Sequence, residues 1–178
     1  MKYKIIFPFF LTICLVITSC KQSNNTLLKE QLDAFIGTDI VIPENLLSFN
    51  DKNHIIKKEA KYKVVSYVDS LSCISCYLDE SAKGWANLLA NFRDGDFSLF
   101  IIFQTQDIES IRTLFDSYKL DYPFFIDLYG DFKQRNAAVP SERKFHTFLL
   151  KNNSVILVGS PAGSSKMLEL YKQEILKK

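Results

Sequence analysis

Two apolar runs, at residues 62–68 and 97–105, restrict the possible folds of this chain more than any other feature. They read YKVVSYV and FSLFIIFQT, and both are rich in β-branched and aromatic side chains. The second run is apolar nearly throughout, which is typical of a strand covered on both faces. Between the runs, apolar residues recur near one helical face, namely Leu78, Trp85, Leu88, Leu89 and Phe92. The sequence therefore predicts a strand, a helix and a second, parallel strand.

The same alternation continues to the end of the sequence. Residues 107–120 have helical spacing, and residues 122–130 are a further strand candidate. Two short apolar runs within 146–160 predict a hairpin, and residues 164–178 suit a terminal helix. This order, β-α-β followed by β-β-α, predicts an α/β fold whose central mixed sheet is flanked by helices. An α/β sandwich with another strand order is the alternative.

The segment before residue 61 has a different character. Residues 27–37 have helical spacing and stop at Gly37, and a short strand candidate runs from Asp39 to Ile42. The next stretch, to Lys61, is rich in loop-forming residues, and we expect it to wrap an edge of the sheet. We therefore divide the sequence into an N-terminal helix and strand extension, 27–60, and a main domain, 61–178.

The first twenty residues have the pattern of an export signal. Lys2 and Lys4 precede an apolar run that is too short to span a bilayer comfortably, and small polar residues stand just before Cys20. The end of this stretch, Ile-Thr-Ser-Cys, resembles a bacterial lipobox, in which the cysteine becomes lipid-modified after cleavage. The resemblance implies a lipoprotein signal peptide at 1–19 and a lipidated polar tether at 20–26. An ordinary cleaved signal with an incidental cysteine is the alternative.

Export would place the rest of the chain in the cell envelope, where thiols can form disulfides. Loss of Lys2 and Lys4 balances the 22 basic against the 20 acidic side chains, so no basic patch indicates a nucleic-acid partner. The sequence contains no glycine-rich phosphate loop and no carboxylate cluster, and we expect no cofactor and no bound metal. Of the four cysteines, Cys73 and Cys76 are the two that lipidation and cleavage would leave free.

Cys73 and Cys76 stand where the first predicted strand gives way to its helix. A helix N-terminus presents unpaired N–H groups and partial positive charge, which favour a thiolate. A C-x-x-C pair can exchange disulfides when the pKa of its first thiol is lowered. Two other interpretations remain open at this point. The pair could be a permanent disulfide without turnover, or it could bind zinc together with His146 and His54, although no zinc spacing rule is satisfied.

From about Lys61 onward, the chain resembles the thioredoxin-like, membrane-tethered thiol–disulfide proteins of the Gram-negative envelope, the redoxin class. It also resembles a group of signal-bearing lipoproteins with a Tyr-Lys, Asp-Ser and Cys-x-x-Cys pattern followed later by His-Thr-Phe-Leu-Leu and Val-Gly. At those points this chain reads KYKVVSYVDSLSCISC and FHTFLLKNNSVILVGSP. The resemblance implies a thioredoxin-like fold, with Cys73 as the nucleophile that attacks a partner disulfide and Cys76 as the resolving thiol. It also implies a protein partner that carries a thiol or a disulfide.

Two departures from that family concern the surroundings of the cysteines. The family usually has an aromatic residue before the first cysteine, where this chain has Leu71 and Ser72. The family also has a cis-proline before the threonine that opens the hairpin, which exposes backbone for substrate pairing. That position is Phe145 or His146 here, and Pro140 lies too far upstream to fill it.

Two side chains are candidates for a supporting role. His146 could lie near Cys73 and stabilise its thiolate, or it could be an ordinary hydrogen-bonding residue. Asp69, directly after the first strand, could transfer protons or could act as a turn residue. The sequence thus predicts a lipid-anchored periplasmic thiol–disulfide oxidoreductase. The competing hypothesis is an envelope lipoprotein of the same fold that serves as a binding or structural module.

The lipid anchor is testable with one substitution. Cys20→Ala removes the thiol that would carry the lipid, so the variant should remain an uncleaved precursor or become a soluble form. Metabolic labelling with a fatty acid, followed by immunoprecipitation, should tag the wild type and not the variant. A wild type that takes up no label would contradict the anchor.

Overall fold

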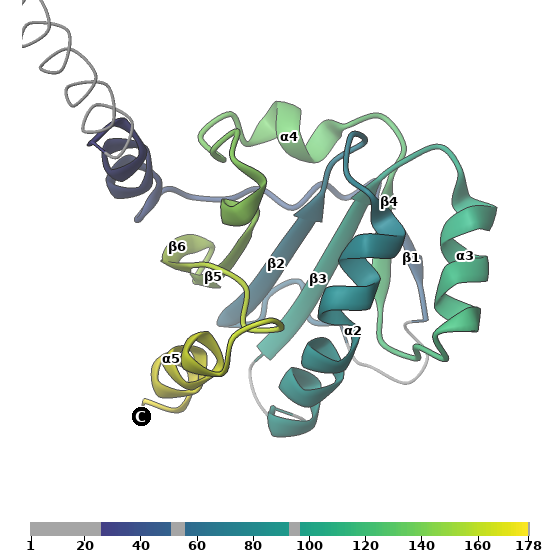
Figure 1. Ribbon diagram of the computed structural model, residues 1–178. Helices are drawn as coiled ribbons and strands as arrows, with labels where there is room; N and C mark the ends of the chain where they lie inside the picture. Colours follow the sequence, from purple (N-terminus) through teal and green to yellow (C-terminus); the bar gives the residue numbers. More distant parts are fainter. Residues whose placement is uncertain (1–25, 51–55, 93–96, 178) are drawn as a thin grey trace, which may run out of the picture. The chain divides into compact units, whose positions relative to one another are not determined.

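The computed structural model describes residues 26–50, 56–92 and 97–177. Its centre is a six-stranded sheet in the order β1-β4-β3-β2-β5-β6 (Figure 1). The strands are β1 (Leu47–Phe49), β2 (Tyr62–Val68), β3 (Phe97–Gln104), β4 (Phe124–Asp127), β5 (Thr147–Lys151) and β6 (Ser154–Val158). β2, β3 and β4 are parallel, whereas β1, β5 and β6 each pair antiparallel with their neighbours. The predicted mixed sheet is therefore confirmed.

The two apolar runs form the centre of this sheet. β2 pairs with β3 over its whole length, from Tyr62 opposite Phe97 to Val68 opposite Phe103. Every residue of β2 is buried, because alternate side chains enter two separate hydrophobic cores. Val64 lies in one core and Val65 in the other. The paired strands thus explain the nearly continuous apolar sequence.

Helices cover both faces of the sheet. α2 (Ile74–Asn91), α3 (Ile108–Ser117) and α5 (Ser165–Leu176) contribute to the core that contains Val64. The short helix α4 (Asp131–Arg135) contributes Phe132 to the core that contains Val65. The sequence did not predict α4, which is only five residues long and too short to show helical periodicity. None of the helices within the described ranges is both long and apolar enough to cross a membrane.

The hairpin agrees with the sequence prediction, and α3 begins at a side-chain cap. Asn152 and Asn153 connect β5 to β6 with φ values of 50° and 75°. Asparagine tolerates this left-handed conformation, which suits the twist of a two-residue hairpin turn. Asp107 caps α3, because its carboxylate accepts a hydrogen bond from the Ser110 amide at 3.1 Å.

The N-terminal part differs from the prediction in one respect. Residues 26–35 form a helix, and residues 26–34 fall in a different unit from the rest of the described chain, which begins at Phe35. The predicted strand from Asp39 to Ile42 is wrong, because only Asp39 makes a bridge, to Ser154. The strand of this segment is β1, which forms one edge of the sheet and pairs with β4. The predicted signal peptide and Cys20 lie outside the described residues.

Gly84 lies inside α2, where the sequence predicts only a weaker or bent helix. The structure gives a different reason for this glycine, because the backbone of Ala162 passes directly against it. A Cβ atom at position 84 would lie 2.0 Å from the Ala162 carbonyl oxygen. The glycine therefore permits the loop between β6 and α5 to pack against α2.

This contact reverses the usual effect of replacing a helical glycine. Gly84→Ala should destabilise the protein by about 1–3 kcal/mol, because the new methyl group overpacks the contact. That loss exceeds the gain of about 1 kcal/mol that alanine gives in an unconstrained helix. Chemical denaturation would measure the difference, with exposed Lys83→Ala as a control that changes only helix propensity. A Gly84→Ala protein more stable than wild type would rule out the close approach.

Candidate redox site

Cys73 and Cys76 form a disulfide at the start of α2, with their Cα atoms 5.3 Å apart. Cys73 is the N-cap residue of the helix. Its Sγ accepts a hydrogen bond from the backbone amide of Cys76 at 3.3 Å and lies 3.5 Å from the Ser75 hydroxyl. The first sulfur therefore occupies the place that an N-cap oxygen normally takes, against the unpaired amides of the first turn.

Both sulfur-bearing residues are exposed to solvent. The exposure of Cys76 differs from what we expect of a C-x-x-C pair at a helix start. In such a pair, the second cysteine lies one turn further into the helix and is shielded from solvent. α2 lies along the sheet with Leu78 and Trp85 facing the core, and Cys76 falls outside that buried set. Access to solvent therefore does not distinguish the two cysteines, whereas the amide contact at Cys73 does.

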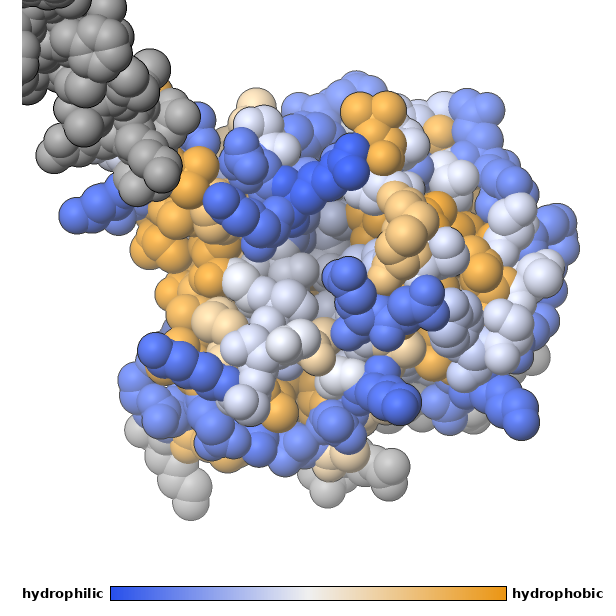
Figure 2. Space-filling view, viewed as in Figure 1, coloured by the Kyte–Doolittle hydropathy of each residue, from blue (hydrophilic) through white to orange (hydrophobic). Residues whose placement is uncertain are grey.

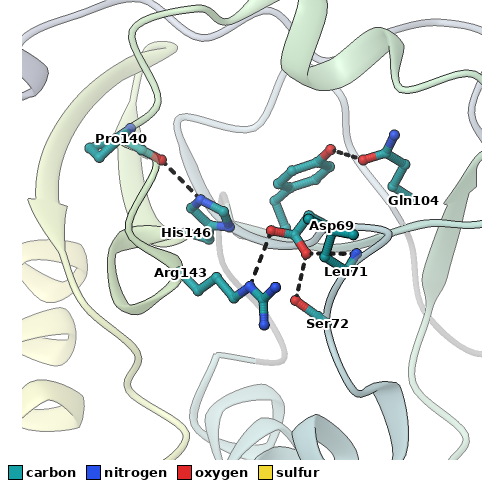
Figure 3. Close-up of polar contacts among 8 residues, drawn as sticks. Asp69, Leu71, Ser72, Gln104, Pro140, Arg143 and His146 are labelled. Atoms are coloured by element: carbon teal, nitrogen blue, oxygen red, sulfur yellow. Dashed lines mark hydrogen bonds and ion pairs between the residues drawn. The ribbon is translucent and has the colours of Figure 1, made fainter.

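The Asp69 side chain organises the loop that leads from β2 to Cys73 (Figure 3). One carboxylate oxygen accepts hydrogen bonds from the Leu71 amide at 3.0 Å and from the Ser72 hydroxyl at 2.8 Å. The other oxygen lies 3.4 Å from Nε of Arg143, in the turn before β5. Asp69 thus has the contacts of a turn residue, and it also links the two loops on either side of the disulfide.

A cleft of about 390 Å³ opens beside the disulfide. Its described lining comes from four parts of the chain: β2 and its following loop, α2, the turn and start of β5, and the β6–α5 loop. The lining residues are Ser66, Tyr67, Val68, Ser72, Cys73, Cys76, Tyr77, Glu80, Ser81, Arg143, Lys144, His146, Thr147, Ser160 and Gly163. Figure 2 shows a hollowed, pale surface on this face with strongly hydrophilic residues around it. The cysteine pair therefore borders a cleft whose lining residues are mostly polar in type, although most of the surface that they present to the cleft is apolar.

A chain of hydroxyl groups lies on the inner side of this cleft. Trp85 donates a hydrogen bond from Nε1 to the Tyr77 hydroxyl at 2.9 Å, which lies 2.9 Å from the Ser66 hydroxyl. Ser66 in turn lies 2.9 Å from the hydroxyl of Thr147. Burial raises the pKa of Tyr77 to about 12, so the phenol stays protonated at neutral pH. The network joins α2, β2 and β5 at the cleft that the disulfide also lines, without introducing a charge.

β5 begins at Thr147, so His146 is the residue directly before the strand. Of the two candidates, Phe145 and His146, it is therefore His146 that takes the position of the family's cis-proline. Its Nε2 lies 2.9 Å from the Pro140 carbonyl, and since a carbonyl can only accept, this nitrogen carries the proton. Burial lowers the pKa of His146, with nearby Lys133 acting in the same direction. A neutral imidazole in the cleft wall offers no positive charge to a thiolate at neutral pH.

The structure also places the other polar residues at this end of the sheet. Asp127 accepts hydrogen bonds from the amides of Asp131 and Phe132, so it caps α4. The Tyr67 hydroxyl donates to Gln104 at 2.6 Å, and burial together with the carboxylates of Asp127 and Asp69 raises its pKa to about 12. These groups stabilise the carboxyl ends of the parallel strands.

Several residues of the site escaped the sequence analysis. Tyr77, Ser66 and Thr147 form the network, and Arg143 and Lys144 line the cleft. One signal for Ser66 was present, because a serine inside a buried strand needs a hydrogen-bond partner. Within the described residues, no three His, Cys, Asp or Glu side chains are grouped as a metal site would require. His54, one of the four candidate zinc ligands, lies outside those residues.

Comparison with solved structures identifies the fold. A thioredoxin domain of a thiol-disulfide oxidoreductase from Bacteroides vulgatus matches with a TM-score of 0.53 and 11% identity, over 76% of this chain and 96% of that one. A thiol:disulfide interchange protein from Bacteroides sp. matches at 0.54 and 13%, over 80% and 86%. A thioredoxin-like protein in its oxidised form matches at 0.50 and 13%, over 80% and 96%.

No family model matches the sequence, and no curated protein matches it. The structural likenesses therefore establish the fold, at sequence identities too low to transfer an activity. The chain has an α/β thioredoxin-like fold with a six-stranded mixed sheet, and it carries a close C-x-x-C pair at the start of α2. This confirms the fold class that the sequence predicts.

The buried state of His146 predicts how stability depends on pH. Its folded-state pKa lies below the unfolded value of about 6.5, so the unfolded chain binds a proton first as the pH falls. The contribution of neutral His146 to the free energy of unfolding is complete above pH ~6.5. Below that pH it declines by up to about 1.4 kcal/mol per pH unit, until the folded-state pKa is reached. His146→Asn should lack this slope in denaturation measured between pH 7 and 5. An NMR titration that gives His146 a pKa above 6.5 would contradict this sign.

Proposed function

We propose that this protein is a thiol–disulfide oxidoreductase that exchanges disulfides with a partner protein through Cys73 and Cys76. The observation that carries the proposal is the exposed disulfide at the N-terminus of α2, beside a cleft. A structural staple has no need of solvent access or of a neighbouring cleft. An exchanging disulfide needs both, because a second sulfur must approach in line with the bond that breaks.

In the reduced protein, Cys73 attacks first. The amide of Cys76 and the other N–H groups of the first turn stabilise a negative charge on its Sγ, which lowers the thiol pKa. The thiolate forms a bond to one sulfur of the partner disulfide, and the second partner sulfur leaves as a thiolate that takes a proton from water. The product is a mixed disulfide between Cys73 and the partner.

Cys76 then resolves the mixed disulfide. It loses its proton, attacks Sγ of Cys73 and releases the partner's remaining sulfur as a thiolate. Two electrons and two protons pass from the protein dithiol to the partner disulfide, and the Cys73–Cys76 bond is restored. Because every step is reversible, the same residues can also oxidise a partner dithiol.

The surrounding residues support this chemistry by position. Asp69 holds the loop before Cys73 through the Leu71 amide and the Ser72 hydroxyl. His146 supports the opposite wall as a neutral residue bonded to Pro140. The uncharged network around Tyr77 adds no carboxylate beneath Cys76, so a proton from that thiol passes to solvent, to which Cys76 is exposed.

We place this activity in the cell envelope, on the periplasmic side, with a lipid on Cys20 as the membrane anchor. The support is the lipobox-like end of the signal and the pair of cysteines that export would leave to react with each other. A partner in that compartment would be another protein that carries a thiol or a disulfide.

The competing proposal is a binding or structural lipoprotein in which the disulfide is permanent. The reduction potential separates the two proposals. A structural disulfide lies below about −300 mV, whereas an exchanger lies well above it. Equilibration with glutathione or dithiothreitol buffers, followed by alkylation and mass spectrometry, would measure the potential of the Cys73/Cys76 couple.

Cysteine variants test the order of attack. Cys76→Ser should accumulate a mixed disulfide through Cys73 in cells, because no thiol remains to resolve it. Cys73→Ser is the matched control, since it removes the thiol that faces the helix amides, and it should trap little or nothing. In the reduced protein, Cys73 should also alkylate faster than Cys76, at a pH below the ~8.5 of a free thiol.

Two outcomes would overturn these assignments. Trapping by Cys73→Ser and not by Cys76→Ser would exchange the roles of the two cysteines. Slow, equal alkylation of both thiols together with no adduct from either variant would favour the structural lipoprotein.

A further inference from the structure

We infer that Arg143 and Lys144 form a subsite for an acidic side chain next to the reacting cysteine of the partner. This inference rests on the proposed disulfide exchange and adds the chemistry of the segment that is recognised. Both residues belong to the short turn Arg143–Phe145 before β5, and both line the cleft that contains the disulfide. The subsite and the reactive sulfurs therefore share one surface.

Asp69 holds Arg143 in a defined position. The contact is made by Nε, at 3.4 Å from the Asp69 carboxylate, and the two terminal nitrogens take no part in it (Figure 3). The Asp69 side chain is 21% exposed and is fixed in turn by the loop before Cys73. A guanidinium that is anchored through Nε can still offer its terminal N–H groups to a second carboxylate.

Lys144 adds a second positive charge to the same wall. The residue is exposed, and its Nζ lies 5.0 Å from the centre of the Phe145 ring, which limits the directions that the side chain samples. Asp69 offsets one of the two cationic charges, which leaves one positive charge among these three residues. Glu142, directly before Arg143, is exposed and is not among the residues that line the cleft. A carboxylate that enters the cleft on this side meets two N–H donors and an excess of positive charge.

The opposite wall has the opposite sign. Glu80 lies on α2, one helical turn after Cys76, and it is exposed and lines the same cleft. Between the two walls, the cleft is lined by neutral hydroxyl groups, including Ser66 and Thr147. A segment with an acidic residue is therefore attracted toward the turn and repelled from α2, which fixes its direction across the disulfide.

Several backbone groups at this turn already have hydrogen-bond partners within the protein. The amide of Phe145 donates to the Glu142 carbonyl at 2.9 Å, and the amide of His146 donates to the Arg143 carbonyl at 3.0 Å. The carbonyl of His146 accepts from the Tyr67 amide at 2.9 Å. These groups are engaged within the protein, so a partner strand cannot pair with them as it would with an open backbone edge. Charge at the rim is then the feature that can distinguish one partner segment from another.

Two peptide disulfides test the subsite. They are the symmetrical disulfides of acetyl-Ala-Asp-Cys-Ala-amide and acetyl-Ala-Asn-Cys-Ala-amide, reduced by the wild-type dithiol form and followed by chromatography of the released thiol. Each rate is divided by the rate of the same peptide with dithiothreitol, which removes the intrinsic effect of aspartate on the sulfur. We expect a normalised preference of about three- to fivefold for the acidic peptide at low salt, the range of a partly exposed ion pair.

The variants decide which residues produce that preference. Arg143→Gln combined with Lys144→Gln should bring the ratio of normalised rates to one, and this ratio is the readout because loss of the Asp69 contact can change both rates together. Arg112→Gln, an exposed arginine on α3, is the matched control and should keep the wild-type ratio. High salt should also reduce the ratio toward one. A fall in both rates with an unchanged ratio would assign a structural role to the turn and overturn the subsite.

The peptide assay also separates this inference from the proposed function. Equal normalised rates for the two peptides in the wild type would overturn the acidic subsite and leave disulfide exchange standing. No reaction with either peptide, together with a potential below about −300 mV, would overturn the exchange itself and the subsite with it.

Discussion

The pairing of β2 with β3, buried on both faces, is the constraint on which the site depends. Seven consecutive residue pairs join the two strands, from Tyr62 opposite Phe97 to Val68 opposite Phe103. Because β2 is paired along its whole length, the position of its last residue is fixed. The loop after Val68 then leads to Cys73, the N-cap residue of α2. Because α2 packs on the same core through Leu78 and Trp85, the helix start cannot move relative to the strand end.

Polar groups within this apolar frame connect the parts of the site. Ser66 interrupts the apolar run of β2, and its hydroxyl lies between those of Tyr77 on α2 and Thr147 on β5. A buried hydroxyl without a partner would cost free energy, so the three elements stay together where the cleft forms. On the outer side, Asp69 links the loop before Cys73 to Arg143. Two sets of contacts thus support the site: the uncharged hydroxyl network within the protein, and the ion pair between Asp69 and Arg143 at its surface.

The fold and the place of the C-x-x-C pair at a helix start were predictable from the sequence because both depend on local patterns. Continuous apolar runs indicated the parallel strands, helical spacing indicated α2, and the C-x-x-C motif followed the first strand directly. α4 and β1 were not predicted, since five and three residues are too few to establish a period. From the sequence, Gly84 could be judged only by its low helix propensity. The reason for a glycine here is the close approach of the Ala162 backbone, 78 positions further along the chain.

By itself, the sequence determined the order of the longer strands and helices after residue 61, the two-sided burial of β3, and the place of the cysteines at a helix start. Each of these follows from residue spacing along one element. Only the tertiary structure decided that β5 begins directly after His146, that Cys76 is exposed, and that Arg143 in the turn before β5 meets Asp69 in the loop after β2. The physical reason is that these properties depend on contacts between segments distant in the chain, whose geometry is set by sheet order and helix packing.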